Sequence, residues 1–226
     1  MTRPAAASQR FWQALPEALR AQLTLIVSPL LEIQPVPFDV DYQKYRAVIF
    51  TSAHGVAQAG QVPGPMPAYC VGERTTAAAR AQGWDAQYMG QTADALVAAL
   101  SCKVVDGPVL HLHGRHKRMN VSAALSQNSL SCQGITVYDQ HLLPLSEAAQ
   151  TSLATGKRHI VPLFSPRTAQ QFAYECNTAT NIFFIAMSEA VAEPLKSLDY
   201  MELQVSQAPD ADAMAKLVSI AADRLA

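Results

Sequence analysis

The feature that most constrains this chain is a short pattern that occurs twice: an apolar strand, then a serine, then a helix. The first copy ends its strand at Ser52 and the second at Ser165, 113 positions later. Further along, Gly72 corresponds to Ser188 at an offset of 116. Units that recur in one order at nearly constant offset indicate two copies of the same strand–helix architecture.

Strand and helix patterns alternate along most of the chain. We expect strands at residues 47–51, 68–71, 85–88, 109–112, 135–138, 160–164, 182–186 and 201–205. Helices are expected near residues 53–59, 73–82, 93–101, 117–126, 146–154 and 211–225, with others ending at 176 and 197. Alternation of this kind is typical of a parallel sheet with helices on both faces. The fold class is therefore α/β.

The amino-terminal part predicts the end of a first strand at residues 2–4, a helix over 5–20 and a strand over 23–27. Pro16 should kink or end that helix. Neither this part nor the tail completes a sheet alone. We therefore expect a discontinuous outer domain, 1–36 plus 143–226, and an inserted domain, 37–142.

Proline-marked extended stretches near residues 35–37 and 141–144 connect the two expected domains. Two such linkers side by side act as a hinge, and a hinge leaves a cleft. The expected architecture is two flavodoxin-like doubly wound domains that are joined by a two-stranded hinge and separated by a cleft.

Composition narrows the classes of function. The 226 residues carry 17 basic and 18 acidic side chains, a net charge of −1, which argues against nucleic-acid or membrane-surface binding. The four cysteines form no CxxC pair, so zinc and redox spacings are absent and reduced thiols in the cytoplasm are expected. No apolar run reaches the ~18 residues that a membrane span needs. A two-lobed protein of this size is expected to be a monomer.

Small and hydroxyl residues follow the predicted strands, where ligands bind in parallel sheets. They lie at helix N-termini, whose free N–H groups and dipole favour carboxylates or phosphates. For each serine, a structural N-cap is the alternative interpretation. The candidates are Ser52, Gly72, Thr75, Gly114, Arg115, Ser165 and Ser188.

The stretch from His111 to Arg118 is the most basic in the chain, and it includes Lys117. His111 and His113 share one face of a strand, but no third ligand at recognisable spacing completes a metal site. An anion-facing loop and a solvated basic turn both stay open. No GxGxxG, GxxxxGK[ST] or GxSxG motif occurs, which weakens dinucleotide, nucleotide and hydrolase interpretations. The residues alone indicate a two-domain α/β protein that binds a small anion in its cleft.

An ordered series of short motifs resembles the uroporphyrinogen-III synthase family and covers nearly the whole chain. The matching pieces are Thr2-Arg3-Pro4, Ser28-Pro29-Leu30, Val48-Ile49-Phe50-Thr51-Ser52-Ala53, Val71-Gly72-Glu73-Arg74-Thr75, Gly114-Arg115, Gly134-Ile135-Thr136-Val137-Tyr138, Leu163-Phe164-Ser165-Pro166-Arg167-Thr168-Ala169 and Ser188-Glu189-Ala190-Val191-Ala192.

The resemblance implies an enzyme of tetrapyrrole and haem biosynthesis that needs no metal or cofactor. It would cyclise hydroxymethylbilane to uroporphyrinogen III, inverting the last pyrrole ring with loss of water. Tyr138 matches the family's cleft tyrosine and would donate the proton, since phenols ordinarily titrate near pH ~10. Thr75 would hydrogen-bond the substrate. Arg3, Arg115, Lys117 and Arg118 would meet its carboxylates.

Each of these roles has a purely structural alternative, in which Tyr138 packs against a linker and Thr75 caps a helix. The chain also departs from the family pattern. Ala190 and Val191 stand where many members carry threonines, and His54 replaces the usual Asn or Arg. The alternative is therefore a non-catalytic two-domain module that binds a small anionic ligand, or a family member that has lost activity.

Overall fold

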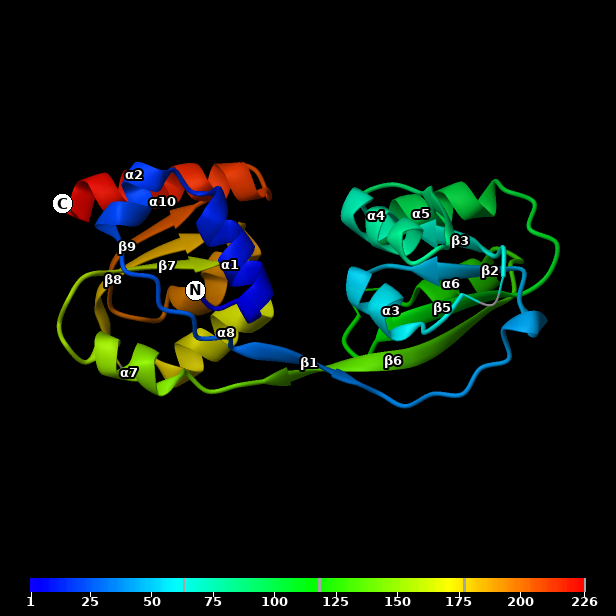
Figure 1. Cartoon of the computed structure of the whole chain (residues 1–226), viewed down its shortest axis with the longest axis horizontal. Coiled ribbons are helices and arrows are strands. Elements are labelled where there is room, and N and C mark those ends of the chain that lie inside the picture. Colours follow the sequence, from blue (N-terminus) through cyan, green and yellow to red (C-terminus); the bar gives the residue numbers. More distant parts are fainter. Residues whose placement is uncertain (63, 118, 177, 226) are drawn as a thin grey trace. The chain divides into compact units, whose positions relative to one another are not determined.

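The computed structural model describes residues 1–62, 64–117, 119–176 and 178–225. The chain divides into two compact units. Unit 1 comprises Met1–Glu32 with His141–Ala226, and unit 2 comprises Ile33–Gln140. These divisions fall four and two positions before the boundaries expected from the prolines, because strands β1 (Leu31–Pro35) and β6 (Cys132–Leu142) run through them. Figure 1 labels the helices and strands of the two units. The hinge and the cleft stay predictions.

A single six-stranded sheet forms the centre of unit 2, in the order β1-β6-β5-β2-β3-β4. The pairs among β6, β5, β2, β3 and β4 are parallel. The strands are β1 (Leu31–Pro35), β2 (Ala47–Phe50), β3 (Pro67–Cys70), β4 (Asp85–Tyr88), β5 (Val109–Gly114) and β6 (Cys132–Leu142). The helices are α3 (Ala53–Gln58), α4 (Glu73–Ala81), α5 (Ala93–Ser101), α6 (Val121–Gln127) and the short 3-10 helix η1 (Tyr42–Lys44).

Helices cover both faces of this sheet, so unit 2 is doubly wound as expected. Val48 and Phe50 pack with α3 and α4, whereas Ala47 and Ile49 pack with α5 and α6. All four residues of β2 are buried, as a central parallel strand requires. The order of β2 to β6 is 3-2-1-4-5, not the flavodoxin order 2-1-3-4-5, and this detail of the expectation is corrected.

Unit 1 holds a parallel three-stranded sheet in the order β7-β8-β9. Phe183 and Ile185 face α1 and α10, while Ile182 and Phe184 face α8 and α9. The strands are β7 (His159–Leu163), β8 (Ala179–Ala186) and β9 (Tyr200–Val205). The helices are α1 (Ala5–Ala14), α2 (Glu17–Gln22), α7 (Glu147–Leu153), α8 (Pro166–Glu175), α9 (Glu189–Ala192), η2 (Glu193–Leu195) and α10 (Ala211–Leu225).

The amino-terminal part departs most from the sequence-based expectation. The helix expected over 5–20 is two helices, because Pro16 ends the first and caps the second. Residues 2–4 and 23–27 are not strands in the described sheets. Both predictions are therefore wrong, since neither stretch has a full-length neighbour with which to form a ladder. The one strand of this part, β1, joins the sheet of unit 2.

Two further observations bear on the class of protein. No helix in the described ranges is both long enough and apolar enough to cross a membrane. All four cysteines are free thiols, and Cys70 and Cys176 are buried.

Candidate active site

In unit 2, the helix N-termini predicted to bind anions lie directly after parallel strands. Ser52 follows β2 and caps α3, where its Oγ accepts a hydrogen bond from the His54 N–H at 3.1 Å. Gly72 follows β3 and caps α4. Its φ of 78° lies in the left-handed region that favours glycine, and its N–H donates to the Gly90 carbonyl at 2.8 Å.

Tyr138 lies beside the end of β5 because the pairing of β5 with β6 shifts register after His113. The shift places Gly114 next to Tyr138. A Cβ built on Gly114 would lie 2.5 Å from Cε2 and Cζ of the Tyr138 ring, so the ring occupies the space that any side chain would need. The His54 ring lies 5.7 Å away, centroid to centroid. Tyr138 is thus held by packing, with 5% of its surface exposed.

The hydroxyl groups of Tyr138 and Thr75 belong to buried side chains. Neither makes a hydrogen bond to any residue in the described parts of the chain. Thr75 is in the first turn of α4 and is buried to 7% exposure, and the helix is capped by Gly72, which has no side chain. The capping role considered for Thr75 is therefore not what its hydroxyl does.

Asp139, a residue that sequence reasoning missed, fixes the loop after β5. The Arg115 N–H donates to the Tyr138 carbonyl at 2.9 Å, and Arg115 Nε donates to Asp139 Oδ2 at 2.6 Å. The Gln140 backbone N–H and then the Arg115 guanidinium hold the pKa of Asp139 below its usual range. The guanidinium of Arg115 is therefore partly neutralised, although 58% of its side chain stays exposed.

Two histidines of β5, His111 and His113, are buried in the strand that precedes this loop. His111 Nε2 lies 3.2 Å from Thr51 Oγ1, and burial, together with His113 and Lys117, lowers the pKa of His111 to about 3. Burial also lowers the pKa of His113. His113 Nδ1 donates to the Gly114 carbonyl at 2.8 Å, so its Nε2 accepts from Lys117 Nζ at 3.3 Å. His113 thus holds Lys117 near the end of β5.

Three predicted residues lie in unit 1. Ser165 and Ser188 follow strands β7 and β8, and Arg3 lies just before α1. Ser165 caps α8, and its Oγ accepts from the Thr168 N–H at 3.2 Å, which bears out the structural N-cap interpretation. Ser188 follows β8, and in the described residues its side chain makes no cap hydrogen bond. The Arg3 guanidinium stacks on the Phe164 ring at 4.4 Å from its centroid.

The structure thus brings the predicted residues together in two sets. Unit 2 collects Ser52, Gly72, Thr75, Gly114, Arg115, Lys117 and Tyr138, and unit 1 collects Arg3, Ser165 and Ser188. Arg118 lies outside the described residues. The described residues contain no group of three or more His, Cys, Asp or Glu side chains that could hold a metal ion.

Chemically, the set in unit 2 combines a free phenol, a free hydroxyl, two helix N-termini and two cations. It can donate a proton and bind anions, and it has no nucleophile–base pair. Val191 lies in the hydrophobic core of unit 1 at 1% exposure, so a threonine at this position would place its hydroxyl in the core rather than at the surface.

The chain was then compared with known proteins. The family described as "Uroporphyrinogen-III synthase HemD" matches residues 13–216. The crystal structure of uroporphyrinogen-III synthetase from Helicobacter pylori is 19% identical with a TM-score of 0.66, covering 85% of this chain and 91% of that one. A mutant uroporphyrinogen III synthase from Thermus thermophilus is 13% identical with a TM-score of 0.54, covering 99% and 100%.

No curated protein gives a significant match. At these identities the solved structures establish a shared fold, whereas the family match covers most of the chain in sequence. The chain belongs to the uroporphyrinogen-III synthase family.

Proposed function

We propose that this chain is an active uroporphyrinogen-III synthase, a lyase that closes hydroxymethylbilane into uroporphyrinogen III. The family match over residues 13–216 supports the activity. The single structural observation that carries the mechanism is the Tyr138 phenol, which is held against Gly114 with its hydroxyl free.

The reaction begins with loss of the terminal hydroxyl of the bilane as water. The pyrrole nitrogen supplies the electrons that break this carbon–oxygen bond, leaving an electrophilic azafulvene. The proton that lets the hydroxyl leave as water comes from the Tyr138 O–H. General acid catalysis of this kind contributes about 10²- to 10⁴-fold. The resulting phenolate recovers a proton when the new macrocycle is deprotonated at the end of the sequence.

Inversion of the last ring starts from the same electrophilic azafulvene. The ring attacks through its substituted carbon and forms a spiro intermediate, which fragments and recombines with the ring reversed. No further acid or base is needed for the bond changes. The protein must hold the chain in one conformation, because the free bilane otherwise closes without inversion.

We propose that positively charged side chains and helix N-termini bind the substrate. The substrate carries many carboxylates, and Arg115 and Lys117 in unit 2 and Arg3 in unit 1 supply positive charge. The N–H groups at the starts of α4 and α8 add dipoles of the same sign. Thr75 donates a hydrogen bond to the substrate. Ser52, Ser165 and Ser188 supply hydroxyl groups, and Gly72 and Gly114 place the backbone beside the substrate.

The setting of the enzyme is part of the same proposal. We expect it to act as a monomer in the cytoplasm, where its free cysteines would stay reduced. Light scattering of the purified protein checks the oligomeric state.

The experiment that tests this function is a coupled assay. Hydroxymethylbilane is generated in place by its upstream synthase, this protein is added, and the oxidised products are separated by isomer. Predominant uroporphyrin III supports the proposal. Isomer I alone, from protein shown to be folded by circular dichroism, would favour the non-catalytic anion-binding module.

A further inference from the structure

His54 is a polar residue of unit 2 that the proposed mechanism does not use. It lies in the first turn of α3, shortly after the cap Ser52, and its side chain is half-buried. Its ring packs against the Tyr138 ring at a centroid distance of 5.7 Å and an interplanar angle of 59°. The proposed proton donor therefore has a second polar ring next to it.

A close approach of α3 to β5 sets this contact. A Cβ built on Gly55, the residue after His54, would lie 2.8 Å from the Leu112 carbonyl oxygen, so any side chain there would push the helix away from the strand. Glycine permits such an approach. The same strand ends at Gly114, against which the Tyr138 ring packs. The two glycines thus bring the imidazole and the phenol to the same strand end.

The nitrogens of the His54 ring are unused within the protein. In the described part of the chain, neither nitrogen forms a hydrogen bond. The histidines of β5 differ, because His111 Nε2 lies 3.2 Å from Thr51 Oγ1 and His113 Nδ1 bonds the Gly114 carbonyl. An imidazole N–H that has no partner in the protein can donate to a carboxylate of a ligand.

A positive charge acts on the same ring from the neighbouring helix. Arg74 is exposed in the first turn of α4, and its guanidinium has no ion pair or hydrogen bond within the described ranges. Burial and then the charge of Arg74 lower the pKa of His54. Near pH ~7.5 the His54 ring is therefore almost entirely neutral.

Few other groups can influence the charge of His54. Of the charged side chains on α4, Arg74 is the one that acts on the ring, and Tyr138 of β6 is the titratable group packed against it. Helix α3 carries no other titratable side chain. Alternation along β5 puts its histidines on the opposite face of the sheet.

An anion would fit between the imidazole and the guanidinium. A carboxylate there would accept a hydrogen bond from His54 and pair with Arg74, and hydrogen bonds to charged groups are the stronger kind. Its negative charge would raise the pKa of His54, because an opposite charge favours the protonated ring. The complex would then take up a proton as it forms.

We propose that His54 and Arg74 bind one carboxylate of the substrate beside the Tyr138 phenol. This inference rests on the proposed function, which supplies a ligand with many carboxylates. A carboxylate held here fixes the hydroxymethyl end of the bilane next to its proton donor, which is the positioning that the reaction requires. Binding moves one proton from solvent to His54, and no covalent bond changes.

The test uses the intact protein and a bilane whose terminal hydroxymethyl group is replaced by methyl. This probe keeps the carboxylates but cannot lose water, so binding is measured without turnover. NMR follows the six histidines over pH, and the resonance absent from His54→Gln identifies His54. We expect the probe to raise the pKa of His54, and its affinity to strengthen about 3- to 10-fold from pH ~7.5 to pH ~6. His54→Gln should bind roughly 2- to 10-fold more weakly and should lack this pH dependence.

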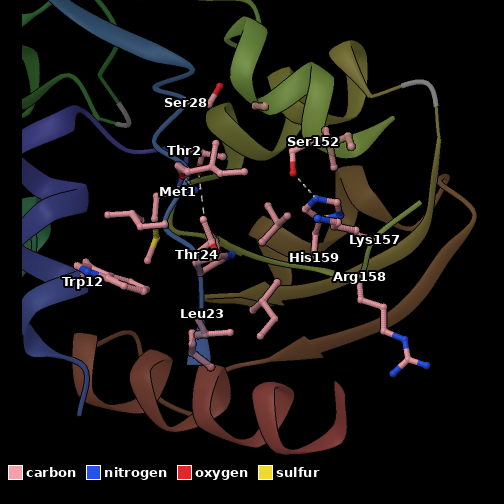
Figure 2. A pocket seen from close by; sticks show the side chains of 18 of the residues that line it. Met1, Thr2, Trp12, Leu23, Thr24, Ser28, Ser152, Lys157, Arg158 and His159 are labelled. Atoms are coloured by element: carbon pink, nitrogen blue, oxygen red, sulfur yellow. Dashed lines mark hydrogen bonds between the residues drawn. The ribbon is translucent and has the colours of Figure 1, made fainter. Parts of the chain in front are cut away.

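His159 supplies a matched control in unit 1. Burial lowers its pKa too, but it lines a separate cavity, where its Nε2 lies 2.8 Å from Ser152 Oγ (Figure 2). The probe should not move its resonance, and His159→Gln should bind the probe like the wild type. Arg74→Gln should raise the pKa of His54 in the free protein, because a like charge is removed, and should weaken binding.

A pKa of His54 that the probe leaves unchanged would overturn the inference. Equal affinity and equal pH dependence in His54→Gln and the wild type would overturn it as well, and so would absence of probe binding. The isomer assay separates this failure from failure of the function. Isomer III from the wild type, with an unchanged KM in His54→Gln, would refute the carboxylate site and leave the function standing. Isomer I alone, with proton uptake at His54 on probe binding, would refute the function and support the carboxylate site.

Discussion

Replacing Gly114 with alanine should displace the Tyr138 phenol. The added Cβ would lie 2.5 Å from the ring, whereas carbon atoms in contact are ordinarily ~3.5–4.0 Å apart. The ring or the strand must therefore shift by about 1 Å. Overpacking of this kind in a buried site costs about 1–3 kcal/mol of the free energy of unfolding. A misplacement of about 1 Å can cost on the order of 10²-fold in rate.

The assay combines urea unfolding with the initial rate of isomer III formation. The matched variant is Tyr138→Phe, which keeps the ring and removes only the hydroxyl. If both changes act by removing the same proton donor, the double variant Gly114→Ala/Tyr138→Phe should be hardly slower than Tyr138→Phe alone. A Gly114→Ala protein with unchanged stability and rate would refute the packing argument. A double variant whose loss of rate equals the product of the two single losses would show that the changes act independently, and would refute the loss of one shared proton donor.

Four other outcomes are expected. Tyr138→Phe should lower kcat by about 10²- to 10⁴-fold with little change in unfolding free energy, and an unchanged kcat in the isomer assay would remove the phenol from the mechanism. Thr75→Val should change stability by less than about 1 kcal/mol but raise KM by roughly 2- to 10-fold, so an unaltered KM would exclude its hydrogen bond to substrate. Asp139→Asn should lower KM, because Arg115 is no longer neutralised; a raised KM would contradict the binding role of Arg115. The lowered pKa of His111 lets the unfolded chain bind one more proton than the folded chain between pH 6.5 and about 3. The free energy of unfolding is therefore unaffected by this group above pH 6.5 and falls by about 1.4 kcal/mol per pH unit below it. In urea titrations, His111→Gln should have a pH slope shallower by that amount, and equal slopes for the two proteins would refute this assignment.

Much of the fold could be predicted from local sequence signals. The run of buried apolar residues in β2 and the serine that follows it define a strand and a capped helix without reference to anything distant. Pro16 likewise ends α1 by its missing N–H. Such features are decided by residues within one turn or one strand of each other.

The parts that sequence reasoning missed depend on distant neighbours. Residues 23–27 have strand composition but form no described strand, because a strand exists only with a partner. The pair of Arg115 with Asp139 joins residues 24 positions apart, and it depends on the register shift after His113. No local pattern encodes that shift, so the position of Tyr138 over Gly114 could be read only from the structure.

The measurement that tests the central claim most directly is the isomer composition formed by the wild-type protein and by Tyr138→Phe from freshly generated hydroxymethylbilane. The account predicts predominantly isomer III from the wild type, and mostly isomer I from the variant as spontaneous closure overtakes it. Isomer I alone from folded wild-type protein would contradict the enzymatic function, and isomer III from the variant at the wild-type rate would contradict the role of Tyr138.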